Sequence, residues 1–224
     1  MSGRVAYYGG IVKNGLILDL DAAKQDSYPR LGTSWKDISG NGNNGTLTNG
    51  PTFNSANGGS IVFDGIDDYI NTSLNGVKLG FTMYVWAKLN QTYNGINLCV
   101  DDGSGYFGLG FYDASNKIQT GGFDTAPRVA VSTVTIATNQ IYNFTGTYSA
   151  GDYSKLYING IFNAQSTTTL ASTGIGSNTT PIKLFKNGPY YTGGNLYLVL
   201  LYNRALTAAE VLQNYNATKT RFGL

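Results

Sequence analysis

Acidic side chains are the residues of this chain whose spacing could support chemistry, because the sequence contains no histidine and a single cysteine. Without histidine, Ser-His-Asp and Cys-His nucleophile pairs and histidine-ligated metal sites are excluded. Cys99 lies within an apolar run, which is typical of a buried structural cysteine. The sole glutamate, Glu210, stands three residues after Thr207, which is the spacing of a capping box at a helix start. We therefore assign no catalytic residue.

Four aspartates in glycine-containing loops remain as candidates: Asp67, Asp68, Asp101 and Asp102. Glycoside hydrolysis requires two carboxyl groups at a fixed separation, whereas adjacent residues of a strand point to opposite faces. Neither adjacent pair therefore predicts an acid/base dyad, and we expect no enzymatic activity. Because calcium binds through oxygen ligands, these four residues are also calcium candidates. We favour the interpretation that each aspartate supports the backbone of its own turn, with no cofactor.

Charge and hydropathy exclude several classes of partner. The formal net charge is +2 and the basic residues are scattered, so no nucleic-acid surface is indicated. No apolar stretch approaches about 18 residues, so no membrane span is predicted. Residues 1–10 lack the apolar segment of a secretory signal peptide. Together with the lone cysteine, this predicts folding in a reducing cytoplasm.

The dominant hydrophobic period is two, which predicts strands. Phe81, Met83 and Val85 alternate with polar and aromatic residues, so we expect these three to face the core. Asn159-Gly160 lies between apolar flanks and predicts a type I′ hairpin turn. The pattern favours an all-β, two-sheet antiparallel sandwich with one short C-terminal helix. Further strands are expected near residues 15–21, 60–63, 69–70, 129–137, 141–148, 182–185 and 196–202, and the helix is expected over 207–216.

The first 14 residues are interpreted as an N-terminal arm, followed by the sandwich domain over residues 15–224. The arm is too apolar for a free tail, and tyrosine and arginine are favoured at protein interfaces. We predict that Arg4, Tyr7, Tyr8 and Ile11 form an assembly element, with Gly9-Gly10 as a hinge. The alternative is an extra edge strand that folds onto its own domain.

Several motifs resemble one known family in both content and order. They are GLILDLDA at residues 15–22, WKDISGNGNNG at 35–45, SIVFDGIDDYI at 60–70, FTMYVW at 81–86, LYING at 156–160 and LYNRALTAAEV at 201–211. Together they are similar to the laminin-G-like branch of the concanavalin A-like lectin/glucanase superfamily. The resemblance implies a jelly roll and, in sugar-binding members, rim loops with calcium. Glucanase members use a glutamate-rich strand, which this sequence lacks.

The variant resembles domains of marine tailed phages, especially cyanophages, where it occurs in virion structural proteins. The resemblance thus implies a capsid decoration or fibre component that folds in the host cytoplasm and is exposed on the particle. Its partners would be other virion proteins or copies of itself, with lectin-like binding of host-surface carbohydrate as a further role. Two alternatives stay open: a carbohydrate-binding module not tied to a virion, and a polysaccharide hydrolase. No glycan-binding residue is assigned.

Overall fold

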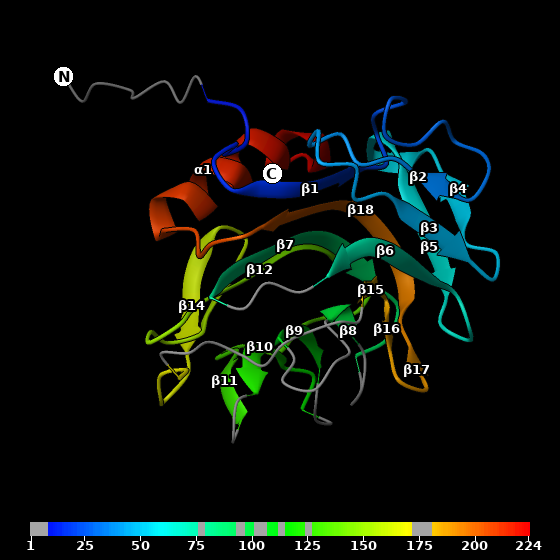
Figure 1. Cartoon of the computed structure of the whole chain (residues 1–224). Helices are drawn as coiled ribbons and strands as arrows, with labels where there is room; N and C mark the ends of the chain where they lie inside the picture. Colours follow the sequence, from blue (N-terminus) through cyan, green and yellow to red (C-terminus); the bar gives the residue numbers. More distant parts are fainter. Residues whose placement is uncertain are drawn as a thin grey trace.

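The computed structural model describes residues 9–75, 79–92, 97–100, 107–111, 115–123, 127–171 and 181–224. Within these ranges the chain forms two facing antiparallel sheets, as the sequence predicts (Figure 1). The alternating pattern explains this architecture, because each strand places one row of side chains between the sheets and the other row outside. No described helix is long and apolar enough to cross a membrane.

The first sheet is organised around two long strands, β7 and β18. Its order is β14-β13-β12-β7-β18-β5-β4, and β18 pairs with β5 near its start and with β1 near its end. The strands are β1 (Leu16–Asp21), β4 (Thr52–Asn54), β5 (Ser60–Asp64), β7 (Gly80–Leu89), β12 (Ile141–Ser149), β13 (Lys155–Ile158), β14 (Ile161–Gln165) and β18 (Gly193–Tyr202).

The second sheet covers the other side of the core, in the order β11-β10-β9-β8-β15-β6-β3-β2. A small hairpin, β16 (Lys186–Asn187) with β17 (Tyr190–Tyr191), lies between β15 and β18 in the chain. The strands of the second sheet are β2 (Ser34–Trp35), β3 (Gly45–Thr48), β6 (Tyr69–Asn75), β8 (Asn97–Val100), β9 (Phe107–Phe111), β10 (Ile118–Phe123), β11 (Pro127–Val131) and β15 (Pro181–Leu184).

The strand predicted over residues 129–137 is shorter in the structure, because β11 ends at Val131. The hydroxyl of Ser132 donates a hydrogen bond to the carbonyl of Val134 at 2.7 Å. This local bond closes a turn of the kind that serine hydroxyls stabilise, and it competes with continued sheet pairing. The prediction was wrong there because a serine near a strand end carries no decisive periodic signal.

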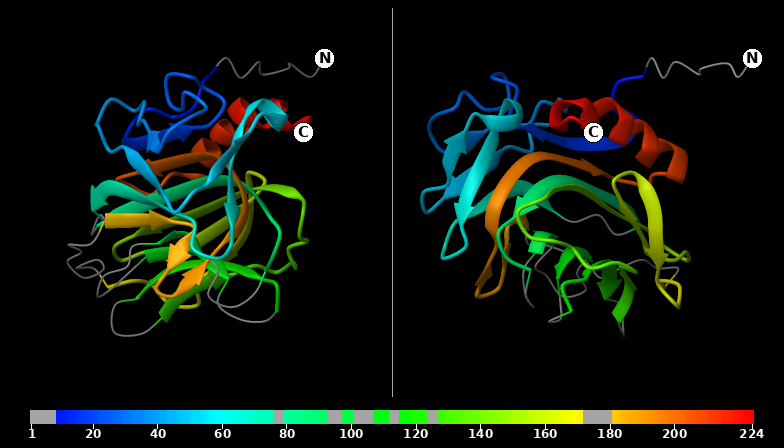
Figure 2. Two further views of the ribbon diagram at one scale, coloured as in Figure 1. Left: turned by 90° about the vertical axis from the view of Figure 1, so that its right-hand side faces the viewer. Right: turned by 180° about the vertical axis from the view of Figure 1, so that it is seen from behind.

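The core prediction for β7 is confirmed. Phe81, Met83 and Val85 are at most 2% exposed and belong to the main core between the sheets. Tyr84 and Trp86, on the opposite face of β7, are also buried, in a second apolar cluster. That face is covered because the C-terminal helix packs over it, so both faces of the central strands are shielded from water (Figure 2).

The single predicted α-helix is present as α1 (Ala208–Thr218), with 3-10 turns at η1 (Ala56–Gly58) and η2 (Lys219–Phe222). Both hydrogen bonds of the expected capping box form between Thr207 and Glu210. The Trp86 ring stacks on Tyr215 of α1 and on Phe222 of η2, with ring centroids 5.6 and 4.3 Å apart. These contacts fix the helix on the outer face of the first sheet.

The predicted hairpin turn is also confirmed. Asn159 and Gly160 have φ values of 51° and 75°, the two positive values that a type I′ turn requires. A Cβ added at Gly160 would lie 2.6 Å from the Cβ of Tyr215, so the glycine also allows close approach to α1. The turn therefore sets the register of β13 and β14 and seats their hairpin against the helix.

Candidate functional site

Three aspartates come together in the loop that joins β5 to β6. One carboxylate oxygen each from Asp64, Asp67 and Asp68 lies within 4.8 Å of the other two. Asp64 and Asp67 are exposed, whereas Asp68 is buried. The structure thus brings together Asp67 and Asp68 of the predicted calcium candidates and adds Asp64. Asp101 and Asp102 lie outside the described residues.

Hydrogen bonds within this loop use some of the carboxylate oxygens of these three aspartates. Asp64 Oδ1 accepts the backbone N–H groups of Ile66 at 2.8 Å and Asp67 at 3.3 Å. Asp68 Oδ2 accepts the N–H of Asp64 at 3.0 Å. The bonds from Ile66 and Asp67 lower the pKa of Asp64, while burial raises the pKa of Asp68. The two carboxylates therefore shape the loop, and the oxygens left over are of the hard type that calcium prefers.

An aromatic box with a lysine inside it lies next to this loop. Lys186 Nζ is 4.3 Å from the ring centroid of Tyr69 and 4.7 Å from that of Tyr191. Its ammonium also donates a hydrogen bond to the Tyr191 hydroxyl at 3.1 Å. This geometry combines cation–π attraction with a charged hydrogen bond. It holds two tyrosine rings and a cation in a fixed arrangement.

The aromatic box is connected to the acidic loop in two ways, along the chain and through the pairing of β5 with β18. Tyr69 follows Asp68 directly, and Asp64 pairs across the sheet with Gly193, two residues after Tyr191. Gln91 Nε2 donates to the carbonyl of Tyr191 at 3.2 Å, which fixes the hairpin against the end of β7. We call the set Asp64, Asp67, Asp68, Tyr69, Lys186 and Tyr191 the acidic-aromatic rim.

The sequence predicted Asp67 and Asp68 of this rim as candidates, but it did not predict Asp64 or the three residues of the aromatic box. Lys186 and Tyr191 are more than a hundred residues from the loop, and no local period connects them. The available signal was the short run Lys186-Asn187-Gly188, a turn sequence with a cation and tyrosines on its flanks.

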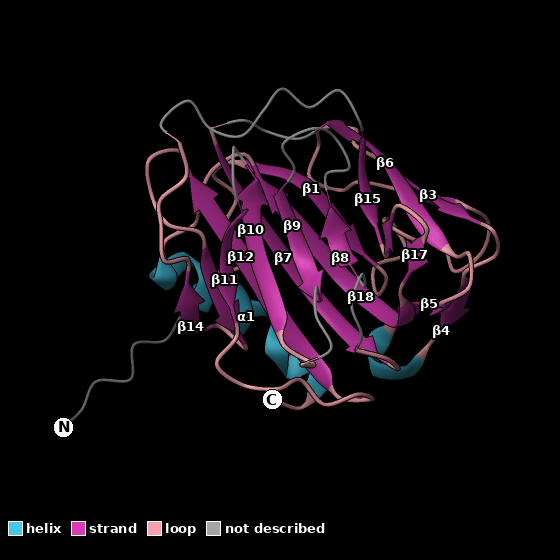
Figure 3. Ribbon diagram, turned by 90° about the horizontal axis from the view of Figure 1, so that it is seen from below, coloured by secondary structure: helices cyan, strands magenta, loops and turns pink. Residues whose placement is uncertain are grey.

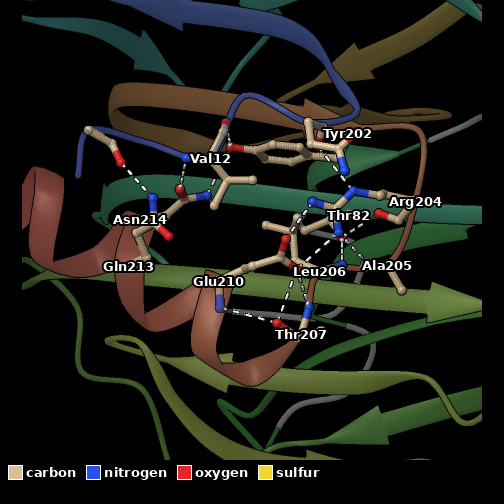
Figure 4. A network of polar contacts seen from close by, with 12 residues as sticks. Val12, Thr82, Tyr202, Arg204, Ala205, Leu206, Thr207, Glu210, Gln213 and Asn214 are labelled. Atoms are coloured by element: carbon tan, nitrogen blue, oxygen red, sulfur yellow. Dashed lines mark hydrogen bonds and ion pairs between the residues drawn. The ribbon is translucent and has the colours of Figure 1, made fainter. Parts of the chain in front are cut away.

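Glu210 takes part in a structural network rather than in this rim. Arg204 binds both of its carboxylate oxygens, at 2.9 and 2.6 Å, and Thr207 donates a backbone N–H at 2.9 Å (Figure 4). The ion pair with Arg204 lowers the pKa of Glu210 to about 2. A carboxylate held ionised and fully paired in this way is unsuited to donate a proton to a substrate.

The predicted assembly residues are only partly described. Arg4, Tyr7 and Tyr8 lie outside the described residues, whereas Ile11 packs against the second apolar cluster of its own domain. The next residue, Val12, is buried and bonded to α1 and β18 (Figure 4). The part of the arm just after Gly9-Gly10 is thus already seated on the sandwich, and its assembly role stays a prediction. Of Cys99, the structure describes only the backbone, in β8.

The chain is similar to known proteins in sequence pattern and in fold. The family model of the concanavalin A-like lectin/glucanases superfamily matches residues 64–212, which is well over half of the chain. No curated protein matches the sequence. Domain 4 of AbnA, a GH43 extracellular arabinanase from Geobacillus stearothermophilus solved with arabinotriose, is 17% identical with a TM-score of 0.66. The match covers 89% of this chain and 98% of that chain.

Two further solved structures share the fold at low identity. The binding domain of Paraclostridial Mosquitocidal Protein 1 is 19% identical, with a TM-score of 0.70 and coverage of 92% of this chain and 52% of that chain. Trypanosoma rangeli sialidase is 15% identical with a TM-score of 0.66, and the match covers 92% of this chain but 33% of the sialidase. At such identities the likeness concerns the fold alone.

Proposed function

Because this chain belongs to the concanavalin A-like lectin/glucanase superfamily, we propose that it is a binding domain that recognises carbohydrate without cleaving it. The observation that carries the proposal is the acidic-aromatic rim, where Lys186 is held between the rings of Tyr69 and Tyr191 and Tyr69 directly follows the three-aspartate loop in the chain. The arabinotriose complex of the arabinanase domain supports carbohydrate as the ligand class, since that domain shares the fold across nearly its whole length.

The rim offers the two kinds of contact that a sugar needs. Lys186 lies over one face of each tyrosine ring, so the C–H groups of a pyranose or furanose would stack on the opposite faces, and the hydroxyls form hydrogen bonds. Exposed carboxylates of Asp64 and Asp67 accept hydrogen bonds from sugar hydroxyls, and Lys186 donates them. The rings are held in place before the ligand arrives, which lowers the entropy lost on binding.

The same residues argue against hydrolysis. Asp68 has a raised pKa, as a general acid requires, but it is only 4% exposed and one of its oxygens accepts the Asp64 N–H. A buried acid of this kind cannot reach a glycosidic oxygen that stays outside the loop. Glu210 is fixed in its ion pair with Arg204. We therefore favour binding over the hydrolase alternative.

The direct test is a glycan array followed by calorimetric titration of the glycan that binds best. We expect Tyr69→Ala and Tyr191→Ala each to weaken binding about tenfold or more, because each removes one stacking face. Tyr153→Ala is the matched control, because this half-buried tyrosine lies outside the rim, shortly after the end of β12 at Ser149. Absence of glycan binding, equal losses in the control, or release of reducing sugar by the wild type would contradict the proposal.

We further propose that this binding domain is a structural component of a virion, either a capsid decoration or a fibre component. The support is the resemblance to phage domains and the apolar N-terminal arm, which provides a means of attachment. A binding domain on the outside of a particle would contact host-surface glycans directly. The test is mass spectrometry of purified particles: stoichiometric copies are expected, and absence from the particles would favour a free carbohydrate-binding module.

A further inference from the structure

A cavity of about 360 Å³ lies on the outer face of the first sheet, where residues 10–13, β1, β18 and the C-terminal segment meet (Figure 2). In Figure 3 the second sheet faces the viewer and the helical segments lie behind the first sheet, so the cavity is remote from the second sheet. Small-molecule sites commonly have volumes of about 300–1,000 Å³. We call this hollow the C-terminal cavity, and none of the residues of the acidic-aromatic rim lines it.

The wall formed by η2 is fixed by Arg221. Its Nη1 donates to Asp21 Oδ1 at 2.8 Å, its Nε donates to the carbonyl of Asn57 at 2.7 Å, and its Nη2 donates to the carbonyl of Gly59. A guanidinium has five N–H donors, and these bonds use three of them. Arg221 therefore holds η2 against β1, so the cavity is formed before a ligand arrives, which lowers the entropy lost on binding.

A second wall, formed by residues 10–13, is fixed in the same way. The carbonyl of Gly10 accepts a side-chain N–H of Gln213 at 2.9 Å, and the carbonyl of Lys13 accepts the N–H of Leu16 at 3.1 Å. The first bond joins the segment to α1, and the second closes a turn before β1. The backbone at Lys13 is therefore held in place, whereas its side chain is exposed.

The interior of the cavity is apolar. Its lining includes Leu198 of β18, which is buried, and Phe222, whose ring stacks on Trp86 with centroids 4.3 Å apart. Ile11 also lines it and packs against the second apolar cluster. Because contacts within the domain hold these side chains, they offer a preformed surface to an apolar group, which would gain free energy by leaving water.

The charged groups that line the cavity are mostly cations. They are Lys13, Lys24 and Arg221, against the single carboxylate of Asp21. Lys24 Nζ lies 3.5 Å from Asp21 Oδ2, and because an ammonium has three donors, Lys24 retains donors for a ligand. Lys13 forms no salt bridge within the described part of the chain. Two ammonium groups are thus available beside an apolar interior.

The buried carboxyl group of Asp19 shows that both ammonium charges are near this part of β1. Burial raises the pKa of Asp19, and the charges of Lys24 and Lys13 oppose the increase. Asp19 lies two residues before Asp21, on the same face of β1, and its Oδ1 has no hydrogen-bond donor among the described residues. The two lysines therefore act on Asp19 through their charge, without a hydrogen bond that would use their donors.

We propose that the C-terminal cavity binds a small organic anion, with its apolar body against Leu198 and Phe222 and its carboxylate or phosphate group between Lys13 and Lys24. A cationic ligand would meet three cations, and a neutral one would gain little from the lysines. Ammonium groups are common ligands of carboxylates and phosphates. The site does not depend on carbohydrate binding at the rim. Its ligand would contact Gly10 and Ile11, where the arm joins the domain.

The test is an NMR titration of the full chain with four probes that share one ring: benzoate, phenyl phosphate, benzyl alcohol and benzylamine. We expect benzoate or phenyl phosphate to bind about tenfold more tightly than benzyl alcohol, and benzylamine to bind most weakly. Comparison of the two anions identifies the preferred head group. Amide shifts should concentrate at residues 10–13 and 217–222. Benzylamine binding as tightly as the anions, or no shift in these segments at millimolar anion, would overturn the proposal.

Charge variants test the position and the sign of the interaction. Lys13→Ala and Lys24→Ala should each weaken anion binding about tenfold. Lys117→Ala is the matched control, because this half-buried lysine directly precedes β10 of the second sheet. Asp19→Asn should strengthen anion binding, since it removes a negative charge near both lysines. Equal losses in the control, unchanged binding when both lysines are replaced, or weaker binding in a folded Asp19→Asn variant would each contradict the assignment.

Discussion

Arg204 binds Glu210 through two parallel hydrogen bonds, Nη1 to Oε2 at 2.9 Å and Nη2 to Oε1 at 2.6 Å. The pair joins the end of β18 to the first turn of α1, and the same carboxylate completes the capping box with Thr207. Thr82 of β7 accepts the N–H of Leu206 at 2.9 Å in the connection between them. The helix is therefore fixed to the first sheet by polar contacts as well as by the stacking of Trp86.

The first prediction is that Glu210→Gln destabilises the protein by about 1–2 kcal/mol at neutral pH, because the charged pair with Arg204 is lost. The pKa of Glu210 falls from its ordinary value of 4.5 to about 2 on folding. Its stabilisation is thus complete above pH 4.5 and is lost as the pH falls toward 2. Thermal unfolding of both proteins should show a melting-temperature difference that disappears over this interval. A constant difference would contradict the assignment.

The second prediction concerns Asp19, a buried carboxyl group of β1 whose Oδ1 has no hydrogen-bond donor among the described residues. Burial raises its pKa; Lys24 and Lys13 oppose the increase, while Asp21 and Asp37 add to it. Since the folded pKa exceeds the ordinary value of 3.8, the ionised group destabilises the folded state as the pH rises through the raised pKa.

Asp19→Asn should therefore raise the melting temperature at pH 7, and the gain should diminish as the pH falls toward 3.8. The measurement is thermal unfolding across this pH range. Asp152→Asn is a useful comparison, because its pKa is lowered by the hydrogen bond from Lys155 and the sign of its effect should be reversed. Destabilisation by Asp19→Asn at neutral pH would show that the carboxylate has a favourable partner.

The fold was predictable because alternation and turn chemistry are local signals. Phe81, Met83 and Val85 alternate strictly, and Asn159-Gly160 has few conformations other than its turn. The burial of Tyr84 and Trp86 was not predictable in the same way, because it depends on a helix more than a hundred residues away. The rim illustrates the same limit: its aspartates are local, whereas Lys186 reaches Tyr69 only after β15 pairs with β6.

The third prediction tests the close approach of the two sheets at Gly146 of β12. A Cβ at this position would lie 2.0 Å from Thr120 Oγ1 and 2.8 Å from Thr120 Cβ, across the core. Gly146→Ala should therefore destabilise the protein by about 1–3 kcal/mol through overpacking, measured by chemical denaturation. Gly10→Ala is the control, because no atom lies within 4 Å of its added Cβ. Equal effects of the two changes would show that the sheets can separate at low cost.

The fourth prediction is that chelation leaves the melting temperature unchanged. Asp64 and Asp68 already use carboxylate oxygens to hold the backbone of their own loop, which favours a loop that is stable without an ion. A bound ion would add stability by linkage, and its removal would lower the melting temperature. A large decrease with chelator that added calcium reverses, and that Asp67→Asn abolishes, would instead establish a calcium site at the rim.

The last prediction distinguishes the role of residues 1–8 of the arm from that of Val12, which anchors the arm to the sandwich. Val12 donates its N–H to Asn214 Oδ1 at 2.7 Å and accepts the Tyr202 hydroxyl at 3.0 Å, both in buried surroundings. Deleting residues 1–12 would leave Asn214 Oδ1 without this donor and the Tyr202 hydroxyl proton without this acceptor, and should cost about 1–3 kcal/mol. Deleting residues 1–8 keeps the anchor, so the melting temperature should stay near that of the full chain while attachment to particles is lost. Comparing both truncations by thermal unfolding and by particle binding distinguishes the outcomes. If the shorter truncation unfolds the domain, the arm belongs to the sandwich; if it still attaches normally, the arm has no assembly role.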